Sequence, residues 1–458
     1  MSAAMPPLGW LGILRLGLVQ TALGAIVVMT TSTLNRVMVV ELTLPAMLPG
    51  ALVAWHYALQ FLRPRLGHGS DVGGRRTPWI LGGMAVLATG GVVAAMATAW
   101  MSTELSAGIA LAVLGFFLIG IGVGAAGTNL LVLLAKRVDD RRRAPAATIV
   151  WVMMIAGFAV TAGVAGHLLD PYSPSRLVAV TSGVSVIAMA VTLLAVWGVE
   201  GRAGPPLPVA ERQAPAPKTP FRVALQQVWA ESAARRFTIF IFVSMLAYGA
   251  QDLILEPFAG AIFGMTPGES TKLSGVQHGG VLAGMIFIAI AAGVGRGGRA
   301  SILRRWIIAG CIASGLALLG LAVAGLVGDS WPLKASVFFL GLANGAYAIA
   351  AIGSMMALVT AGRKSREGVR MGMWGAAQAV AFGSGGFLGT VAVDVARATL
   401  GSPLMAYAVV FAIEGLLFFV AAVLAARIPV REVGDTAQDD EATGAEPNAS
   451  LTLQGARA

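Results

Sequence analysis

Long runs of apolar residues, separated by short polar segments, recur along the whole chain. Each run holds roughly 20 residues, which is the length that an α-helix needs to cross the hydrocarbon core of a bilayer. The pattern predicts twelve membrane-spanning helices, which we place at 11–34, 44–63, 78–100, 107–134, 146–168, 176–198, 237–262, 273–294, 305–327, 333–360, 371–393 and 403–426.

The composition excludes an ordinary soluble protein. Hydrophobic residues make up 57% of the 458 residues and charged residues only 12%, whereas a soluble domain carries about 25% charged residues. A transmembrane β-barrel would show alternating segments of about ten residues. The runs here are continuous, so the predicted spans are helices, and the 59 glycines suit close helix packing in lipid.

A proline-rich segment divides the predicted spans into two groups of six. Residues 199–236 contain six prolines and are predicted to form a flexible cytoplasmic linker. We therefore expect an all-α integral membrane protein with two six-helix halves, 1–198 and 237–428. The acidic tail, 429–458, is expected to be disordered. This layout resembles the major facilitator superfamily, whose two halves are repeats.

Basic residues are distributed unevenly between the two sides that twelve spans define. Most of the 32 lysines and arginines lie in the loops that share a side with both chain ends, and the other side holds only Arg36, Arg176, Lys272, Lys334 and Arg397. Because basic loops collect in the cytoplasm, we expect both termini there. The same loops account for the net charge of +10, so we expect no nucleic-acid partner.

The loop after the second predicted span carries glycine, aspartate and arginine at a regular spacing: Gly67, Asp71, Gly74, Arg75 and Arg76. Glycine allows two helices to reverse tightly at the membrane face, and the aspartate can bind a helix N-terminus or an arginine. The segment resembles the loop motif of the facilitator superfamily. The alternative is a generic basic loop that only sets orientation.

Charged residues within the apolar runs are costly in lipid and are candidates for function. Asp252 and Glu256 lie four residues apart, on one face of the seventh predicted span. They could bind a cation or carry a proton, unless Glu256 already lies at the outer interface. Glu414 falls in the middle of the twelfth span and either faces lipid or pairs within the bundle. Arg36 and Glu41 are expected to form an ion pair at the first hairpin.

Two histidines lie in corresponding spans of the two halves. His56 lies in span 2 with Gln60 one turn away, and His278 follows Gln277 in span 8. Neutral imidazole is a good metal ligand, although a buried histidine bonded to a neighbouring helix is the simpler interpretation. Cys311 is the only cysteine, and we find no spacing typical of a resident metal site and no nucleotide-binding or catalytic motif.

Several segments resemble the PucC/LhaA family, the bacteriochlorophyll-delivery branch of the facilitator superfamily. They are Arg15 to Gln20, Thr30 to Glu41, Arg63 to Arg65, Gly67 to Asp71 and Gly74 to Trp79. The resemblance implies a non-enzymatic factor in the photosynthetic inner membrane of a bacterium. It implies binding or delivery of bacteriochlorophyll to light-harvesting antenna polypeptides around the reaction centre.

If bacteriochlorophyll binds, its magnesium needs an axial ligand, and His56 and His278 are the candidates. Its ring needs an apolar, aromatic-lined slot; the candidate lining residues are Trp55, Trp151, Phe158 and Trp374. The alternative function is a proton-coupled transporter of a small solute that works through Asp252 and Glu256. An integral membrane enzyme of pigment synthesis is a third hypothesis.

Overall fold

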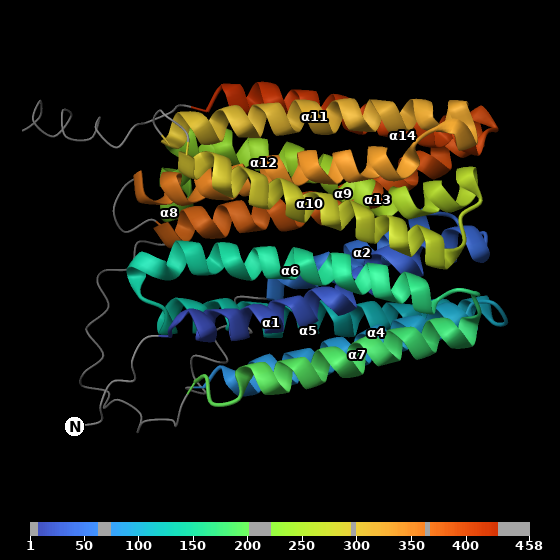
Figure 1. Ribbon diagram of the computed structural model, residues 1–458, viewed down its shortest axis with the longest axis horizontal. Coiled ribbons are helices and arrows are strands. Elements are labelled where there is room, and N and C mark those ends of the chain that lie inside the picture. The colour runs from blue at the N-terminus through green and yellow to red at the C-terminus, as the bar shows by residue number, and fades with distance from the viewer. Residues whose placement is uncertain (1–7, 63–74, 201–220, 295–298, 362–366, 429–458) are drawn as a thin grey trace, which may run out of the picture.

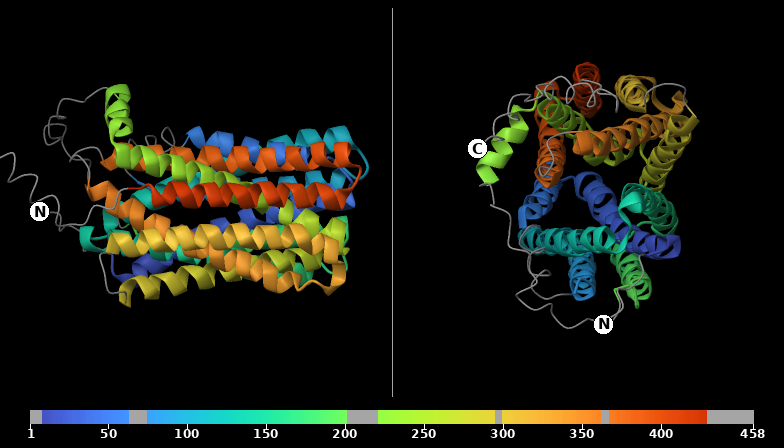
Figure 2. Two further views of the ribbon diagram at one scale, coloured as in Figure 1. Left: turned by 90° about the horizontal axis from the view of Figure 1, so that it is seen from above. Right: turned by 90° about the vertical axis from the view of Figure 1, so that its left-hand side faces the viewer.

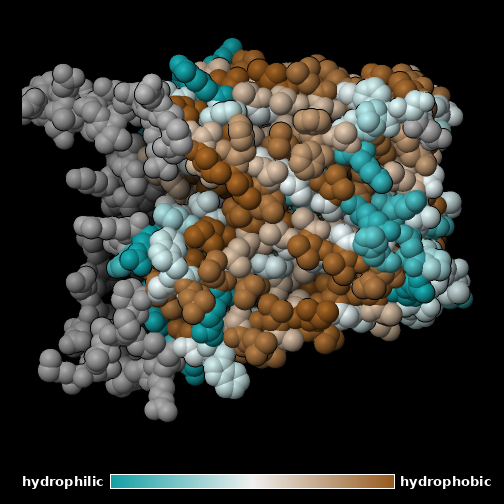
Figure 3. Space-filling view, in the orientation of Figure 1, coloured by the Kyte–Doolittle hydropathy of each residue, from teal (hydrophilic) through white to brown (hydrophobic). Residues whose placement is uncertain are grey.

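A computed structural model describes residues 8–62, 75–200, 221–294, 299–361 and 367–428. The helices run side by side as one elongated bundle, and an end-on view separates them into two groups (Figures 1 and 2). Apolar side chains cover the middle of the face shown in Figure 3, and polar side chains gather toward both ends. Lipid solvates the middle of such a surface and water solvates its ends.

The N-terminal half contains six membrane helices. The first, α1 (Trp10–Val28), continues through two π-helical turns, η1 (Met29–Leu34) and η2 (Val37–Glu41). The second is α2 (Met47–Ala58), extended by a 3₁₀ turn, η3 (Leu59–Leu62). The others are α4 (Thr77–Trp100), α5 (Leu105–Arg137), α6 (Asp140–Leu168) and α7 (Pro174–Val196).

The C-terminal half contains α9 (Ser232–Phe263), α10 (Pro267–Val294), α11 (Arg299–Val327), α12 (Leu333–Ala361), α13 (Glu367–Leu400) and α14 (Pro403–Ala426), with a 3₁₀ turn, η5 (Gly328–Ser330), after α11. The two halves meet where α6 packs on α10 and α2 packs on α13. The all-helical fold with two six-helix halves agrees with the prediction.

Eleven helices of the described chain are long and apolar enough to cross a membrane. The second predicted span is shorter: α2 has 12 residues and η3 adds four. Pro45 precedes this helix and Thr43 has a left-handed φ of 51°, so the chain turns before the helix can start. The first span is longer than predicted, because η1 and η2 carry the helix on to Glu41.

The predicted linker, 199–236, is helical over part of its length. A short helix, α8 (Phe221–Ala230), lies within it, and α9 starts at Ser232. Apolar residues recur at helical spacing in α8, and Val228 is fully buried, because α8 packs against α9 and α13. The rest of the proline-rich segment, 201–220, and the predicted tail, 429–458, lie outside the described residues.

Glycines allow α10 and α12 to pack closely, as their spacing predicts. A Cβ atom at Gly341 would lie 2.0 Å from the Gln277 carbonyl oxygen, and one at Gly345 would lie 2.0 Å from that of Val281. Both distances are far inside van der Waals contact, so only glycine fits. This contact holds α10, which carries His278, against α12.

Hydrogen bonds that involve the ends of helices are present at both ends of the bundle. At the termini end, where the described chain begins and stops, the backbone N–H of Leu8 donates to the Arg137 carbonyl at 2.7 Å. Arg236 likewise donates to the Arg427 carbonyl at 2.8 Å. Each of these bonds stays within one half. The opposite end, which holds the α4–α5 and α9–α10 turns, is called the far end below.

Most of the predicted loop motif (Gly67, Asp71 and Gly74) lies outside the described residues, but Arg75 and Arg76 directly precede α4, and Arg76 is its N-cap residue. The Glu200 carboxylate accepts hydrogen bonds from the backbone N–H groups of Arg76, at 2.5 Å, and Thr77, at 2.7 Å. Burial raises the pKa of Glu200, but bonds from Thr77 and Arg76 and the Arg75 charge outweigh it, and the pKa is lowered. Glu200 therefore caps α4 as an anion.

We predict that both termini face the cytoplasm. With buried Cys311 left in place, a cysteine replacing exposed Thr103 at the far end should react with a membrane-impermeant maleimide in spheroplasts. A cysteine replacing exposed Gln226 in α8 should react only after the membrane is disrupted. The unaltered protein is the background control, and the reverse labelling pattern would refute the orientation.

We predict that Glu200→Gln lowers the free energy of unfolding by about 1 kcal/mol at neutral pH, since a helix cap contributes about that much. The carboxylate has a lowered pKa in the folded protein. Its contribution to the free energy of unfolding is therefore fully present above the ordinary pKa of 4.5, and it disappears as the pH falls through the lowered pKa of the folded protein. Thermal unfolding in detergent at several pH values measures this.

The matched control is Glu104→Gln, because Glu104 occupies the N-cap of α5 without a capping side-chain hydrogen bond. Equal losses of stability in the two variants, or a loss for Glu200→Gln that persists in acid, would contradict the capping role.

Candidate functional site

A run of polar residues enters the middle of the bundle where α1 becomes π-helical. The turn η1 contains Thr30 to Thr33, and all four side chains are buried. The wider π turn shifts the helical phase, so adjacent hydroxyl groups point at α9 and α10 of the other half. Such turns are frequent at functional sites.

The η1 hydroxyl groups bond to residues of the C-terminal half. Ser32 Oγ donates to Glu256 Oε1 on α9 and lies 3.0 Å from Ser274 Oγ on α10. Thr33 Oγ1 lies 3.1 Å from Thr271 Oγ1. Together with Asn35, which donates to the Leu253 carbonyl at 2.5 Å, these residues form what we call the polar seam between the halves.

Glu256 is an interior residue of the seam. It is only 2% exposed and lies seven positions before the end of α9, so its side chain is enclosed by the protein. Asp252, one turn earlier on the same face of α9, is partly accessible. The two carboxyl groups therefore line the same junction.

His278 lies one turn beyond Ser274 on α10 and is buried. Its Nδ1 is 2.9 Å from the Ser274 carbonyl oxygen. A carbonyl only accepts, so Nδ1 carries the proton and Nε2 presents a lone pair. Nε2 makes no hydrogen bond to any described residue. Phe158 of α6 packs edge-on against the ring, with centroids 5.0 Å apart.

Several buried polar atoms of the seam and its flanks have no hydrogen-bond partner among the described residues. They are both amide atoms of Gln251, Nε2 of Gln277, Oε2 of Glu256 and Oδ1 of Asn35. A buried polar atom without a partner costs free energy. Their concentration on α9, α10 and the end of α1 marks where the polar groups of a ligand would be stabilised.

His56 and Gln60 do not join this seam. Both are buried on α2 and η3, and the His56 ring contacts Tyr57, with centroids 4.5 Å apart. The second helix of each half does carry a histidine, as predicted, but only His278 contacts a seam residue. His56 instead lies where α2 packs against α5.

The predicted aromatic slot is not formed. Trp55 is 41% exposed on α2 and stacks on Phe117. Trp374 is buried within the C-terminal half against Phe237, at 5.1 Å between centroids. Trp151 is half-buried on α6. Helical phase therefore directs the tryptophans to different surroundings, and of the proposed lining residues only Phe158 contacts His278.

Glu414 lies inside the C-terminal half rather than toward lipid. It is 2% exposed on α14, which packs on α11. Neither carboxyl oxygen has a hydrogen-bond partner in the described part of the chain. It is a second buried carboxyl group, separate from the seam.

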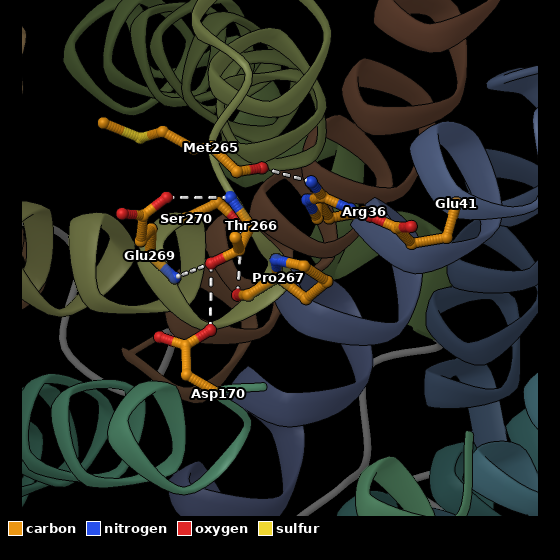
Figure 4. Close-up of polar contacts among 8 residues, drawn as sticks. All are labelled: Arg36, Glu41, Asp170, Met265, Thr266, Pro267, Glu269 and Ser270. Atoms are coloured by element: carbon orange, nitrogen blue, oxygen red, sulfur yellow. Dashed lines mark hydrogen bonds and ion pairs between the residues drawn. The ribbon is translucent and has the colours of Figure 1, made fainter. Parts of the chain in front are cut away.

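The predicted ion pair between Arg36 and Glu41 is present at the far end, at 2.5 Å. Arg36 also donates to the Met265 carbonyl in the α9–α10 turn (Figure 4). The pair therefore does more than cap the first hairpin, because it connects the N-terminal half to the C-terminal half.

The sequence reasoning missed the residues that join the halves through hydroxyl, carboxylate and ammonium groups. They are Ser32, Thr33, Thr271 and Ser274 in the seam, and Asp170, Thr266, Lys272 and Asp394 at the far end. One local signal was available: Thr266 and Glu269 have the spacing of a helix capping box, and Thr266 N–H donates to Glu269 Oε2 at 2.9 Å.

The fold is that of known transporters. The chain superposes on the nucleoside transporter NupG with a TM-score of 0.64 at 16% identity, covering 91% of this chain and 99% of that one. The peptide transporter POT gives 0.64 at 15% identity, covering 94% and 98%. These similarities establish the facilitator fold alone.

Sequence comparisons identify the family. The chain is 50% identical over 439 residues to the "Bacteriochlorophyll synthase 44.5 kDa chain" of Rhodobacter capsulatus, covering 93% of this chain and all of that protein. It is 30% identical to "Protein PucC" of the same organism, covering 92% of each chain. The family model "PUCC protein" matches residues 33–433. The chain therefore belongs to the PucC family.

Proposed function

We propose that this protein is a non-enzymatic assembly factor that binds bacteriochlorophyll and delivers it to light-harvesting antenna polypeptides. Membership of the PucC family and the name of the relative from Rhodobacter capsulatus support a link to bacteriochlorophyll. The proposal places the protein in the intracytoplasmic photosynthetic membrane with both termini in the cytoplasm. Its partners are the antenna polypeptides, the reaction centre and membrane lipids.

The main support for this proposal is the tautomer of the His278 ring, which leaves Nε2 without a hydrogen bond to any described residue. The magnesium of bacteriochlorophyll takes an axial ligand, and a neutral imidazole supplies one. Histidine ligands commonly donate their second ring N–H to a carbonyl, which fixes the tautomer and the orientation of the ring. The bond from His278 Nδ1 to the Ser274 carbonyl does this and leaves Nε2 available.

The surroundings of His278 also fit a pigment. Phe158 supplies an aromatic edge beside the imidazole, and the buried amide groups of Gln251 and Gln277 can donate to carbonyl groups on the periphery of the macrocycle. His56 is the weaker candidate, because both of its ring nitrogens are fully buried. A lipid-soluble pigment needs only a lateral opening between helices, so transport across the whole bilayer is not required.

We predict that His278→Ala lowers the amount of bacteriochlorophyll bound per protein at least about tenfold. Loss of a residue that only supports a metal ligand already lowers metal affinity about tenfold or more. Extraction and chromatography of pigment from the gently purified protein measures this. His167→Ala, at an exposed histidine on α6, is the matched control. Full pigment retention by His278→Ala with unchanged thermal stability would eliminate His278 as the ligand.

The cellular role is tested separately. A clean deletion in a strain without a close paralogue should lose antenna complexes, and the unaltered gene should restore them. Normal antenna levels in that deletion would contradict an assembly role, whatever the pigment content of the purified protein. Turnover of a pigment precursor by the purified chain alone would contradict the non-enzymatic part of the proposal.

Proton-coupled transport is the second candidate, because Asp252 and Glu256 lie one turn apart where the two halves meet. Such coupling predicts solute-dependent proton influx into proteoliposomes, and we expect none from the unaltered protein. Influx that is lost in Glu256→Gln but kept in Glu414→Gln, the buried carboxyl group outside the seam, would establish the transporter instead. A pH-sensitive dye in the lumen reports the influx.

A further inference from the structure

At the far end, two carboxylates each accept hydrogen bonds from the opposite half. Asp394, on α13 of the C-terminal half, accepts hydrogen bonds from the backbone N–H groups of Ala46, at 3.0 Å, and Met47, at 2.7 Å. These groups begin α2 in the N-terminal half. Ala46, the N-cap residue, has no side-chain oxygen to cap the helix itself. Asp394 therefore supplies the N-terminal cap of α2 from the other half.

The second carboxylate makes the corresponding contact in the opposite direction. Asp170, which follows α6 in the N-terminal half, accepts from Thr266 Oγ1 at 2.9 Å and from Lys272 Nζ at 3.0 Å. Both donors belong to the start of α10 in the C-terminal half (Figure 4 shows the Thr266 contact). Asp170 therefore caps and pairs with α10 across the interface.

The backbone at the start of α10 is shaped for this contact. A Cβ atom at Gly268 would lie 2.2 Å from Asp170 Oδ1, so only glycine lets the carboxylate reach the helix. Burial raises the pKa of Asp170, but the bonds from Lys272, Thr266 and the Gly268 backbone outweigh this effect and lower it. Asp170 therefore binds as an anion, which the positive end of a helix favours.

The two contacts are related by the repeat of the fold. The helices α6 and α13 are the fifth membrane helices of their halves, and α2 and α10 are the second. In both places a carboxylate bonds to the N-terminus of the second helix of the other half; Asp394 lies within the fifth helix, and Asp170 lies in the turn directly after it. The pairs α6–α10 and α2–α13 also provide the main packing between the halves.

We propose that Asp170 and Asp394 are a reciprocal pair of latches that hold the far end of the bundle closed, and that this end opens only when both carboxylates leave their helices. The contacts can be broken, because the side chains of Asp170 and Lys272 are 30% and 32% exposed and water can replace their hydrogen bonds. The bond from Arg36 to the Met265 carbonyl lies beside the Asp170 latch.

Distance measurements between spin labels in the purified full-length protein test this proposal. One label replaces Thr103, in the α4–α5 turn of the N-terminal half, and the other replaces Ala335, at the start of α12; both residues are exposed. The variants are Asp170→Asn, Asp394→Asn and the double variant. The control is Glu269→Gln, because Glu269 bonds the same α10 N-terminus from within its own half.

We expect one closed distance for the unaltered protein and for Glu269→Gln. The ratio of open to closed protein should rise on the order of tenfold in each single variant, because a charge-assisted hydrogen bond is lost. It should rise on the order of a hundredfold in the double variant, because the sites are separate. No cargo is needed, so the result does not depend on the proposed function.

An unchanged closed distance in the double variant would overturn the proposal. If the double variant fails to fold, the single variants decide: a longer distance in both, but not in Glu269→Gln, supports the latches. A distance unchanged in both single variants, or changed equally in Glu269→Gln, refutes them.

Discussion

A carboxyl group buried between two membrane-embedded halves must find its hydrogen bonds inside the protein, because lipid offers none. Glu256 finds one on the opposite half, from Ser32 in η1 to Oε1, and Ser32 in turn lies 3.0 Å from Ser274 on α10. The rest of the structure follows from this constraint. The first π-helical turn places Ser32 and Thr33 in contact with the other half, and His278 lies one turn beyond Ser274 of the same seam.

Polar contacts join the two halves in the seam and at the far end. At the far end, Asp170, Asp394 and Arg36 bond to backbone or side-chain groups of the other half. At the termini end, the polar contacts of Leu8, Glu200 and Arg236 stay within one half. The interior between the halves is polar and partly unsatisfied, which suits the proposed binding of a large ligand.

Much of the fold could be predicted from the sequence, because it depends on properties that are local. Apolar length gives the spans, and abundant glycine indicates close helix packing, although the sequence does not say which helices pair. The exceptions are also local in origin: α2 is short after the turn at Thr43, and an amphipathic pattern makes α8 helical within the predicted linker.

The site was harder to predict, because it depends on helical phase and on contacts between distant segments. His278, Asp252 and Glu256 were recognisable as ionisable groups in apolar surroundings, and the Arg36–Glu41 pair as neighbours one turn apart. The tryptophans could not be placed without the rotation of each helix, and Trp55 and Trp374 prove to face different surroundings. Ser32 is an unremarkable residue until the π turn directs it at Glu256.

The central claim is that the polar seam holds bacteriochlorophyll through His278. A cryo-electron microscopy map of the protein, purified gently from a phototrophic membrane with its pigment, tests this most directly. The account predicts a macrocycle between α6, α9 and α10, with its magnesium bonded to Nε2 of His278. A pigment bound elsewhere with its magnesium on another ligand, or a pigment-loaded preparation in which the seam stays empty, would contradict it.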